Sequence, residues 1–125
     1  MTKILVIEDD AVNAQVLRDF LSAHGYEIET ARTGLEGLKR FKENPPALAI
    51  IDVLLPQRNG FEVAFSIRHS PEGSATPLLL MSAVYTDLAH AEEYATKGIG
   101  AQGYLIKPFE LPLLLERVRA LVGEA

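Results

Sequence analysis

The run Ala47-Leu48-Ala49-Ile50-Ile51-Asp52 is the most informative segment of the chain, because an uninterrupted apolar stretch ends in a carboxylate. Continuous apolar runs of this length are typical of strands buried on both faces of a parallel sheet. Two other apolar runs also end in charged residues: residues 4–7 precede Glu8-Asp9-Asp10, and residues 104–106 precede Lys107-Pro108. Ligands of open parallel sheets bind at the carboxyl ends of the strands, so the pattern predicts a charged site at that edge.

Strand-like runs alternate with helical patterns along the whole chain. This alternation predicts parallel strands joined by right-handed crossovers, and therefore an α/β fold. The expected strands cover residues 3–8, 27–31, 47–52, 77–82 and 102–107.

The helical segments carry apolar residues at helical spacing, which predicts one inward face for each. Asp10, Thr33 and Asn59 are the expected N-caps of the first three helices. The fourth segment, about Asp87 to Lys97, has the weakest pattern. The predicted inward residues are Val12, Val16, Leu17, Phe20 and Leu21; Leu35, Leu38 and Phe41; Phe61, Ala64 and Phe65; Leu88, Ala91 and Ala95; and Leu111, Leu114, Leu115, Val118, Leu121 and Val122.

Length and composition indicate a single globular domain. The chain has 125 residues, of which 48% are hydrophobic and 23% charged, which suits one core. We expect the domain to cover residues 1–122, with residues 123–125 as a tail or the start of a linker. A net charge of -5 argues against direct binding to nucleic acid, so protein partners are expected.

Targeting signals are not apparent in the sequence. Met1-Thr2-Lys3-Ile4 does not begin a signal peptide, and no apolar stretch approaches the roughly 20 residues needed to span a bilayer. The chain contains no cysteine, which excludes disulfides and thiolate metal sites. A cytoplasmic location without membrane association is therefore the expectation.

Acidic side chains should crowd one edge of the predicted sheet. The carboxylates of Glu8, Asp9 and Asp52 would repel one another unless a cation holds them. Hard oxygen ligands suit Mg2+, which keeps several waters and completes its shell with phosphate oxygens. The sequence therefore predicts a Mg2+ site, in which Mn2+ could substitute.

A carboxylate beside Mg2+ and an ammonium group can act as a nucleophile toward a phosphoryl group and form an aspartyl phosphate. Asp52 is the candidate nucleophile, and Lys107 is the candidate cation that neutralises phosphoryl oxygens. Ser82 ends the apolar run at residues 78–81, so its hydroxyl is expected at the same edge.

Taken in their order and spacing, these motifs resemble the receiver domain of response regulators in two-component signalling, over essentially the whole chain. The segments that carry the resemblance are Glu8-Asp9, Asp52, Ser82-Ala83, Tyr104 and Lys107-Pro108-Phe109. Pro56 and Gly60 match the turn that follows the phosphoacceptor strand of that family.

The resemblance implies a role for each residue of the predicted site. Asp52 would be the phosphoacceptor. Glu8, Asp9, Asp52 and the backbone carbonyl of Leu54 would hold Mg2+. Ser82 would be the switch hydroxyl, Tyr104 the switch aromatic, and Lys107 the phosphoryl-binding lysine, aimed inward by a cis Lys107-Pro108 bond.

The resemblance also implies a fold and partners. The fold would be flavodoxin-like, a doubly wound sheet of five parallel strands in the order 2-1-3-4-5 with five helices. The phosphoryl group would come from a sensor histidine kinase or a phosphotransfer protein in a phosphorelay. A downstream effector protein or domain would read the switched surface, and a phosphorylation-dependent dimer is left open. The chain would promote its own phosphorylation and dephosphorylation without being an enzyme.

Two features depart from the family pattern. The segment between Ser82 and Lys107 is longer than usual, and the extra residues fall within Val84 to Gly100. The residues two positions after Asp52 and Ser82 are Leu54 and Val84, neither of which can orient a water molecule by a hydrogen bond. Slow hydrolysis of the phosphoaspartate is therefore predicted.

Three other functions remain open from the residues. A pseudo-receiver would keep the fold as an interaction module without phosphorylation. A phosphatase of the haloacid dehalogenase type would need an acid where Leu54 stands. A flavodoxin-like electron carrier would need a Ser/Thr-rich loop in place of Glu8-Asp9-Asp10, whose charges would repel a flavin phosphate. His24, His69 and His90 are assigned to the solvated surface.

Overall fold

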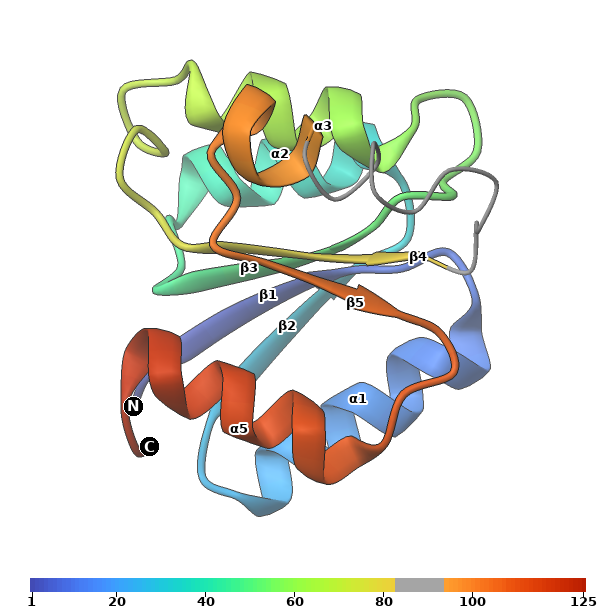
Figure 1. Ribbon diagram of the computed structural model, residues 1–125, viewed down its shortest axis with the longest axis vertical. Coiled ribbons are helices and arrows are strands. Elements are labelled where there is room, and N and C mark those ends of the chain that lie inside the picture. The colour runs from blue at the N-terminus through green and yellow to red at the C-terminus, as the bar shows by residue number, and fades with distance from the viewer. Residues whose placement is uncertain (83–93) are drawn as a thin grey trace.

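Five parallel strands form one sheet in the order β2-β1-β3-β4-β5 in the computed structural model, which describes residues 1–82 and 94–125 (Figure 1). The strands agree with the predicted runs to within about one residue, and β3 and β4 are buried along their whole length. Their bounds are Lys3–Ile7 for β1, Glu27–Ala31 for β2, Leu48–Asp52 for β3, Leu78–Ser82 for β4 and Gly103–Ile106 for β5.

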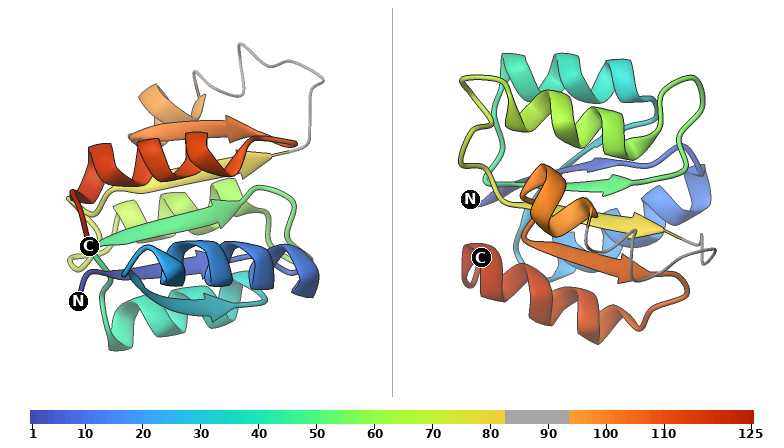
Figure 2. Two further views of the ribbon diagram at one scale, coloured as in Figure 1. Left: turned by 90° about the horizontal axis from the view of Figure 1, so that it is seen from below. Right: turned by 45° about the horizontal axis from the view of Figure 1, so that its top comes forward.

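Helices cover both faces of this sheet (Figures 1 and 2). One face carries α1 and α5, and the other carries α2, α3 and a short π-helix, η1. Each layer buries its own apolar cluster against the strands, as expected for a doubly wound fold. The bounds are Ala11–Ala23 for α1, Gly34–Glu43 for α2, Gly60–Arg68 for α3, Tyr94–Ile99 for η1 and Leu111–Val122 for α5.

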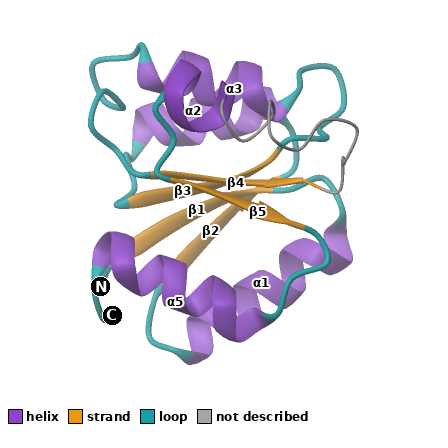
Figure 3. Cartoon of the chain, viewed as in Figure 1, coloured by secondary structure: helices purple, strands orange, loops and turns teal. Residues whose placement is uncertain are grey.

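The three predicted N-caps are confirmed. Asp10 Oδ1 accepts hydrogen bonds from the backbone N–H groups of Val12 and Asn13, at 2.9 and 3.0 Å. Thr33 Oγ1 and Asn59 Oδ1 each accept a backbone N–H three residues later, at 3.0 and 2.9 Å. These caps fix where α1, α2 and α3 begin, at the edge of the sheet where the strands have their carboxyl ends (Figure 3).

Four residues that were predicted to face inward are exposed instead. The exposed fractions are 71% for Val12, 45% for Val16, 60% for Leu35 and 47% for Phe65. Those four predictions are wrong because apolar spacing identifies residues that share a helix face but does not fix how the helix is rotated on the sheet. Residues not predicted to face inward, Ala14, Val63 and Ile67, are buried.

The fourth helical segment is described only from Tyr94 onward. Ala95 is buried as predicted, and η1 ends at Ile99 rather than near Lys97. Val84, Leu88, Ala91, His90 and the predicted helix start at Asp87 lie outside the described residues.

The end of the chain packs beside the α1–β2 turn. Tyr26 donates a hydrogen bond of 2.6 Å from its hydroxyl to the carbonyl of Gly123, and Arg119 pairs with Glu124 at 3.0 Å. The helix α5 ends at Val122, and the division into a domain of residues 1–122 and a tail stays a prediction. Across the described ranges, no helix is both long enough and apolar enough to cross a bilayer.

Candidate functional site

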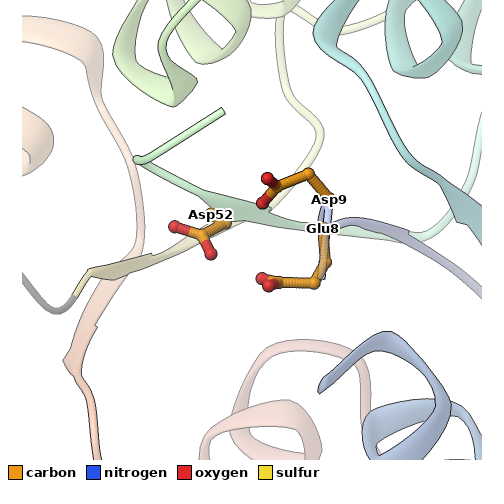
Figure 4. Close-up of side chains that lie close together, drawn as sticks. All are labelled: Glu8, Asp9 and Asp52. Carbon is orange, nitrogen blue, oxygen red and sulfur yellow. The ribbon is translucent and has the colours of Figure 1, made fainter. Parts of the chain in front are cut away.

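The carboxyl ends of β1 and β3 bring three carboxylates together. The register pairs Ile7 with Ile51, so Glu8 and Asp52 follow at the same level of adjacent strands. Glu8, Asp9 and Asp52 each offer a carboxylate oxygen within 4.8 Å of the others, and Figure 4 shows the three groups around one space. The predicted acidic cluster is thus present, with Glu8 and Asp52 buried and Asp9 exposed.

Lys107 joins this cluster from the end of β5. Its Nζ lies 2.6 Å from Asp52 Oδ2 and 3.2 Å from Glu8 Oε2. Its backbone N–H donates to the carbonyl of Ser82 at 2.8 Å, and the bond from Lys107 to Pro108 is cis, as the resemblance implies. The lysine therefore reaches both buried acids while its backbone is tied to the neighbouring strand β4.

Asp52 is held from two directions. Its Oδ1 accepts the backbone N–H of Leu54 at 2.9 Å, which leaves Oδ2 to Lys107. Behind it, a β-carbon on Gly60 would lie 2.1 Å from the Asp52 carbonyl oxygen, so only glycine allows α3 to begin this close to β3. The sequence match of Gly60 to the family turn therefore has a steric basis.

Burial and charge shift two ionisation equilibria in the site. Burial is the main cause that raises the pKa of Glu8, to about 7. The hydrogen bonding and negative charge of Asp52 add to the rise, against the opposing effect of Lys107. Burial alone would lower the pKa of Lys107, but the hydrogen bond and charge of Asp52, with Glu8, outweigh it and raise that pKa. Lys107 is therefore a firmly protonated cation, and Glu8 is an acid that titrates near neutral pH.

The Glu8 shift predicts a pH-dependent stability in metal-free buffer. Glu8 has a pKa of about 7 when folded, against an ordinary value of 4.5, so the folded protein binds the proton more tightly. Its contribution to the free energy of unfolding is fully present below the unfolded pKa. That contribution is lost as pH rises through the folded pKa, in total on the order of 3 kcal/mol.

Urea unfolding across this pH window provides the measurement. Glu8→Gln keeps the side-chain shape without the titrating group, so its free energy of unfolding should fall much less between about pH 4.5 and about pH 7.5. Glu116→Gln, at an exposed acid of α5, is the matched control and should behave like wild type. An identical pH dependence in wild type and Glu8→Gln would contradict the assignment.

The remaining predicted residues surround the cluster at different distances. Ser82 ends β4, is fully buried, and lies one residue beyond Met81, the register partner of Asp52. Tyr104 is buried, with 7% exposed, in the core beneath α2, α3 and η1, and is not part of the charged cluster. The Leu54 side chain is 56% exposed, and a role for its carbonyl as a metal ligand stays a prediction.

One feature of the site was missed by the sequence reasoning. A largely apolar pocket of about 440 Å³ opens beside Glu8 and Lys107, between α1 and the start of α5. Val16 is the residue that could have indicated this pocket. Its helical spacing predicts core packing, yet it is exposed and lines the pocket. Other lining residues include Asn13, Leu17, Met81, Phe109 and Leu111.

Two of the predicted surface histidines are described. His24 and His69 are exposed, and each pairs Nδ1 with the backbone carbonyl four residues earlier, at 2.9 Å. Both lie at helix C-termini and away from the acidic cluster, in agreement with a surface assignment.

The response regulator receiver domain family matches residues 4–119 of the chain. The polar-differentiation response regulator DivK of Brucella ovis is 32% identical over 126 residues, which cover all of both chains. The phosphate regulon transcriptional regulatory protein PhoB of Rhizobium meliloti is 34% identical over the whole of this chain, which spans only 54% of PhoB.

Solved structures give the same relationship. The chemotaxis protein CheY4 of Vibrio cholerae superimposes with a TM-score of 0.87 at 30% identity, over 97% of this chain and 98% of that one. Sequence similarity and fold similarity therefore both extend over nearly the full length of this chain.

Proposed function

Because the chain belongs to the response regulator receiver domains, we propose that Asp52 accepts a phosphoryl group from a phosphohistidine and that the aspartyl phosphate switches a protein-interaction surface. The observation that carries the proposal is the 2.6 Å contact between Lys107 Nζ and Asp52 Oδ2, inside a cluster of three acids. A carboxylate held between a lysine and further acids suits nucleophilic attack on phosphorus better than helix capping.

In the proposed transfer, an Asp52 carboxylate oxygen forms a bond to the donor phosphorus while the phosphorus–nitrogen bond to the donor imidazole breaks. The electron pair of the broken bond leaves with the imidazole. Lys107 holds the acceptor carboxylate in place and neutralises charge on the phosphoryl oxygens as the transition state forms. The Leu54 N–H fixes the other Asp52 oxygen, so the attacking group has one orientation.

The residues present fit a divalent cation. Three carboxylates face a single ammonium group, so the cluster keeps excess negative charge, and its oxygen donors are those that Mg2+ prefers. We infer that Glu8, Asp9, Asp52 and the carbonyl of Leu54 hold Mg2+, with Mn2+ as a substitute. The bound ion would supply positive charge to the phosphoryl oxygens.

The proposed switch links this chemistry to a surface. In the family scheme, the phosphoryl group draws Ser82 toward Asp52, and Tyr104 occupies a more inward position. The face formed by the fourth helical segment, β5 and α5 then changes shape for an effector. The pairing of β4, which ends in Ser82, with β5, which holds Tyr104, supports this coupling.

Apolar groups beside the acidic cluster support a protein as phosphodonor. Val12 and Val16 are exposed on α1 just after Asp9, and Leu54 is exposed two residues after Asp52. Charged pockets that serve only small ions do not require exposed apolar side chains around them. We propose that a histidine kinase or phosphotransfer protein docks here. A cytoplasmic location, the effector and any phosphorylation-dependent dimer stay predictions.

Metal dependence tests the proposal. With acetyl phosphate and millimolar Mg2+, intact-mass measurement should show one added phosphoryl group, and with EDTA it should show none. Asp9→Asn should lose most of this labelling, because one metal ligand becomes neutral. Asp19→Asn, at an exposed acid on α1, is the control and should label like wild type.

Thermal unfolding gives an independent readout of the same site. Removing one of three crowded carboxylates should raise the melting temperature of Asp9→Asn in metal-free buffer, because repulsion falls. Mg2+ should raise the melting temperature of wild type and have little effect on this variant. A metal-free melting temperature well below wild type would contradict the repulsion argument.

A further inference from the structure

Three aromatic rings from three different elements lie in contact on the α3 side of the sheet. Phe61 of α3 stacks on Tyr104 of β5, with ring centroids 6.5 Å apart and planes inclined by only 9°. The same Phe61 ring meets Tyr94 of η1 edge to face, at 5.3 Å and 68°. Both geometries are favoured between aromatic rings. Phe61 therefore contacts both tyrosines and connects them.

The three rings extend from the core to the surface. Tyr104 is 7% exposed, Phe61 is half-buried, and Tyr94 is 50% exposed. A rotation of Tyr104 out of the core must give up its stacking on Phe61. A change in the position of Tyr94, which solvent and partners can reach, must change what Phe61 packs against.

The Tyr94 ring packs directly against Gly98. A β-carbon on Gly98 would lie 2.8 Å from Tyr94 Cδ1 and 3.1 Å from Cε1, so the ring covers the backbone where a side chain would stand. Both residues belong to η1, a π-helical turn, a geometry that occurs often at functional positions in helical segments. The placement of Tyr94 is thus tied to the local shape of η1.

We propose that Phe61 is a positioning residue for Tyr104 and that Tyr94 holds Phe61 in place, so that the conformation of η1 and the orientation of Tyr104 are coupled. The inference rests on the proposed function in one respect, the assignment of Tyr104 as the switch aromatic. Coupling of this kind is reciprocal: a partner that fixes η1 would bias Tyr104, and a shift of Tyr104 would alter the exposed surface at Tyr94.

Nitration of tyrosines by tetranitromethane, resolved by peptide mass mapping, measures the exposure of each ring. In Phe61→Leu the nitration rate of Tyr104 should rise roughly two- to tenfold, because a ring pair is lost while an apolar side chain remains. Phe65→Leu makes the same change on the same helix, where Phe65 is 47% exposed and stacks on His69. That control should leave the Tyr104 rate unchanged.

Tyr26 reports global opening within the same sample, because it is 2% exposed and its hydroxyl bonds the Gly123 carbonyl. Its nitration should stay at the wild-type rate in Phe61→Leu. If Tyr26 and Tyr104 accelerate equally, Phe61 contributes only general stability and the proposal is overturned.

A double-mutant cycle tests the role of Tyr94. Tyr94→Leu should raise the nitration of Tyr104 in the wild-type background and have no further effect in the Phe61→Leu background. Tyr94→Phe, which keeps the ring, should restore the wild-type rate. An equal effect of Tyr94→Leu in both backgrounds would show that Tyr94 acts without Phe61, against the proposed coupling.

These rates are measured on the unphosphorylated protein, so they do not depend on whether Asp52 accepts a phosphoryl group. If Asp52 fails to label but Tyr94→Leu acts on Tyr104 only through Phe61, the proposed function is contradicted and the coupling of the rings is supported. If Asp52 labels but Tyr94→Leu acts equally in both backgrounds, the proposed function is supported and the coupling is contradicted.

Discussion

Replacing Lys107 with glutamine is expected to slow the phosphorylation of Asp52 by acetyl phosphate by about 100- to 1,000-fold, roughly 2.7 to 4 kcal/mol of barrier. The reason is geometric and electrostatic. Nζ lies 2.6 Å from Asp52 Oδ2, so it holds the acceptor group and supplies a positive charge where the phosphoryl oxygens arrive. Glutamine keeps a hydrogen-bond donor but loses the charge and part of the reach.

The measurement is the rate of phosphoryl incorporation by intact mass at saturating Mg2+, which also limits repulsion between the acids that Lys107 leaves behind. Lys39→Gln makes the same change at an exposed lysine of α2 and should label at the wild-type rate. Far-ultraviolet circular dichroism confirms that both variants are folded. A Lys107→Gln rate equal to that of Lys39→Gln would show that the lysine is structural only.

The second large effect concerns hydrolysis of the phosphoaspartate. Leu54 is two residues after Asp52, and its side chain is 56% exposed at the site, where a polar group could hold the attacking water in line. Leu54→Asn is therefore expected to speed the loss of phosphate by about tenfold to a hundredfold, roughly 1.4 to 2.8 kcal/mol of barrier.

Decay of the intact-mass signal after removal of the donor, with excess Mg2+, follows this step. Leu35→Asn is the matched control, because Leu35 is also an exposed leucine, 60% exposed, at the start of α2. It should decay like wild type. Equal lifetimes in wild type and Leu54→Asn would show that this position does not limit water attack. Val84, the other apolar position in the prediction, lies outside the described residues.

The sequence was sufficient for the strands because buried parallel strands have a strong local signature. The continuous apolar run ending at Asp52 forms β3, and the alternation of such runs with helical patterns predicts the parallel strands. The strand order is implied only by the family resemblance. The site residues at the strand ends follow from the same signature, because the carboxyl ends of parallel strands lie at one edge of the sheet. This is why the sequence alone predicts that Glu8, Asp52 and Lys107 lie together, as they do.

Helix rotation could not be predicted in the same way. Val16 and Phe65 have the spacing of core residues, yet they are exposed, because tertiary packing decides which part of an apolar stripe meets the sheet. The contact of Phe61 with Tyr94 and Tyr104 also depends on three elements distant in sequence. Spacing along the chain carries no information about that contact.

The assignment of Asp52 as the phosphoacceptor is tested most directly by site-resolved mass spectrometry after treatment with acetyl phosphate and Mg2+. The wild type should gain one phosphoryl group, and reduction of the acyl phosphate with borohydride should mark the peptide that contains Asp52. Asp52→Asn, which is nearly the same shape but cannot form the acyl phosphate, should gain none. An equal mass gain in Asp52→Asn, or a mark on another peptide in the wild type, would contradict the claim.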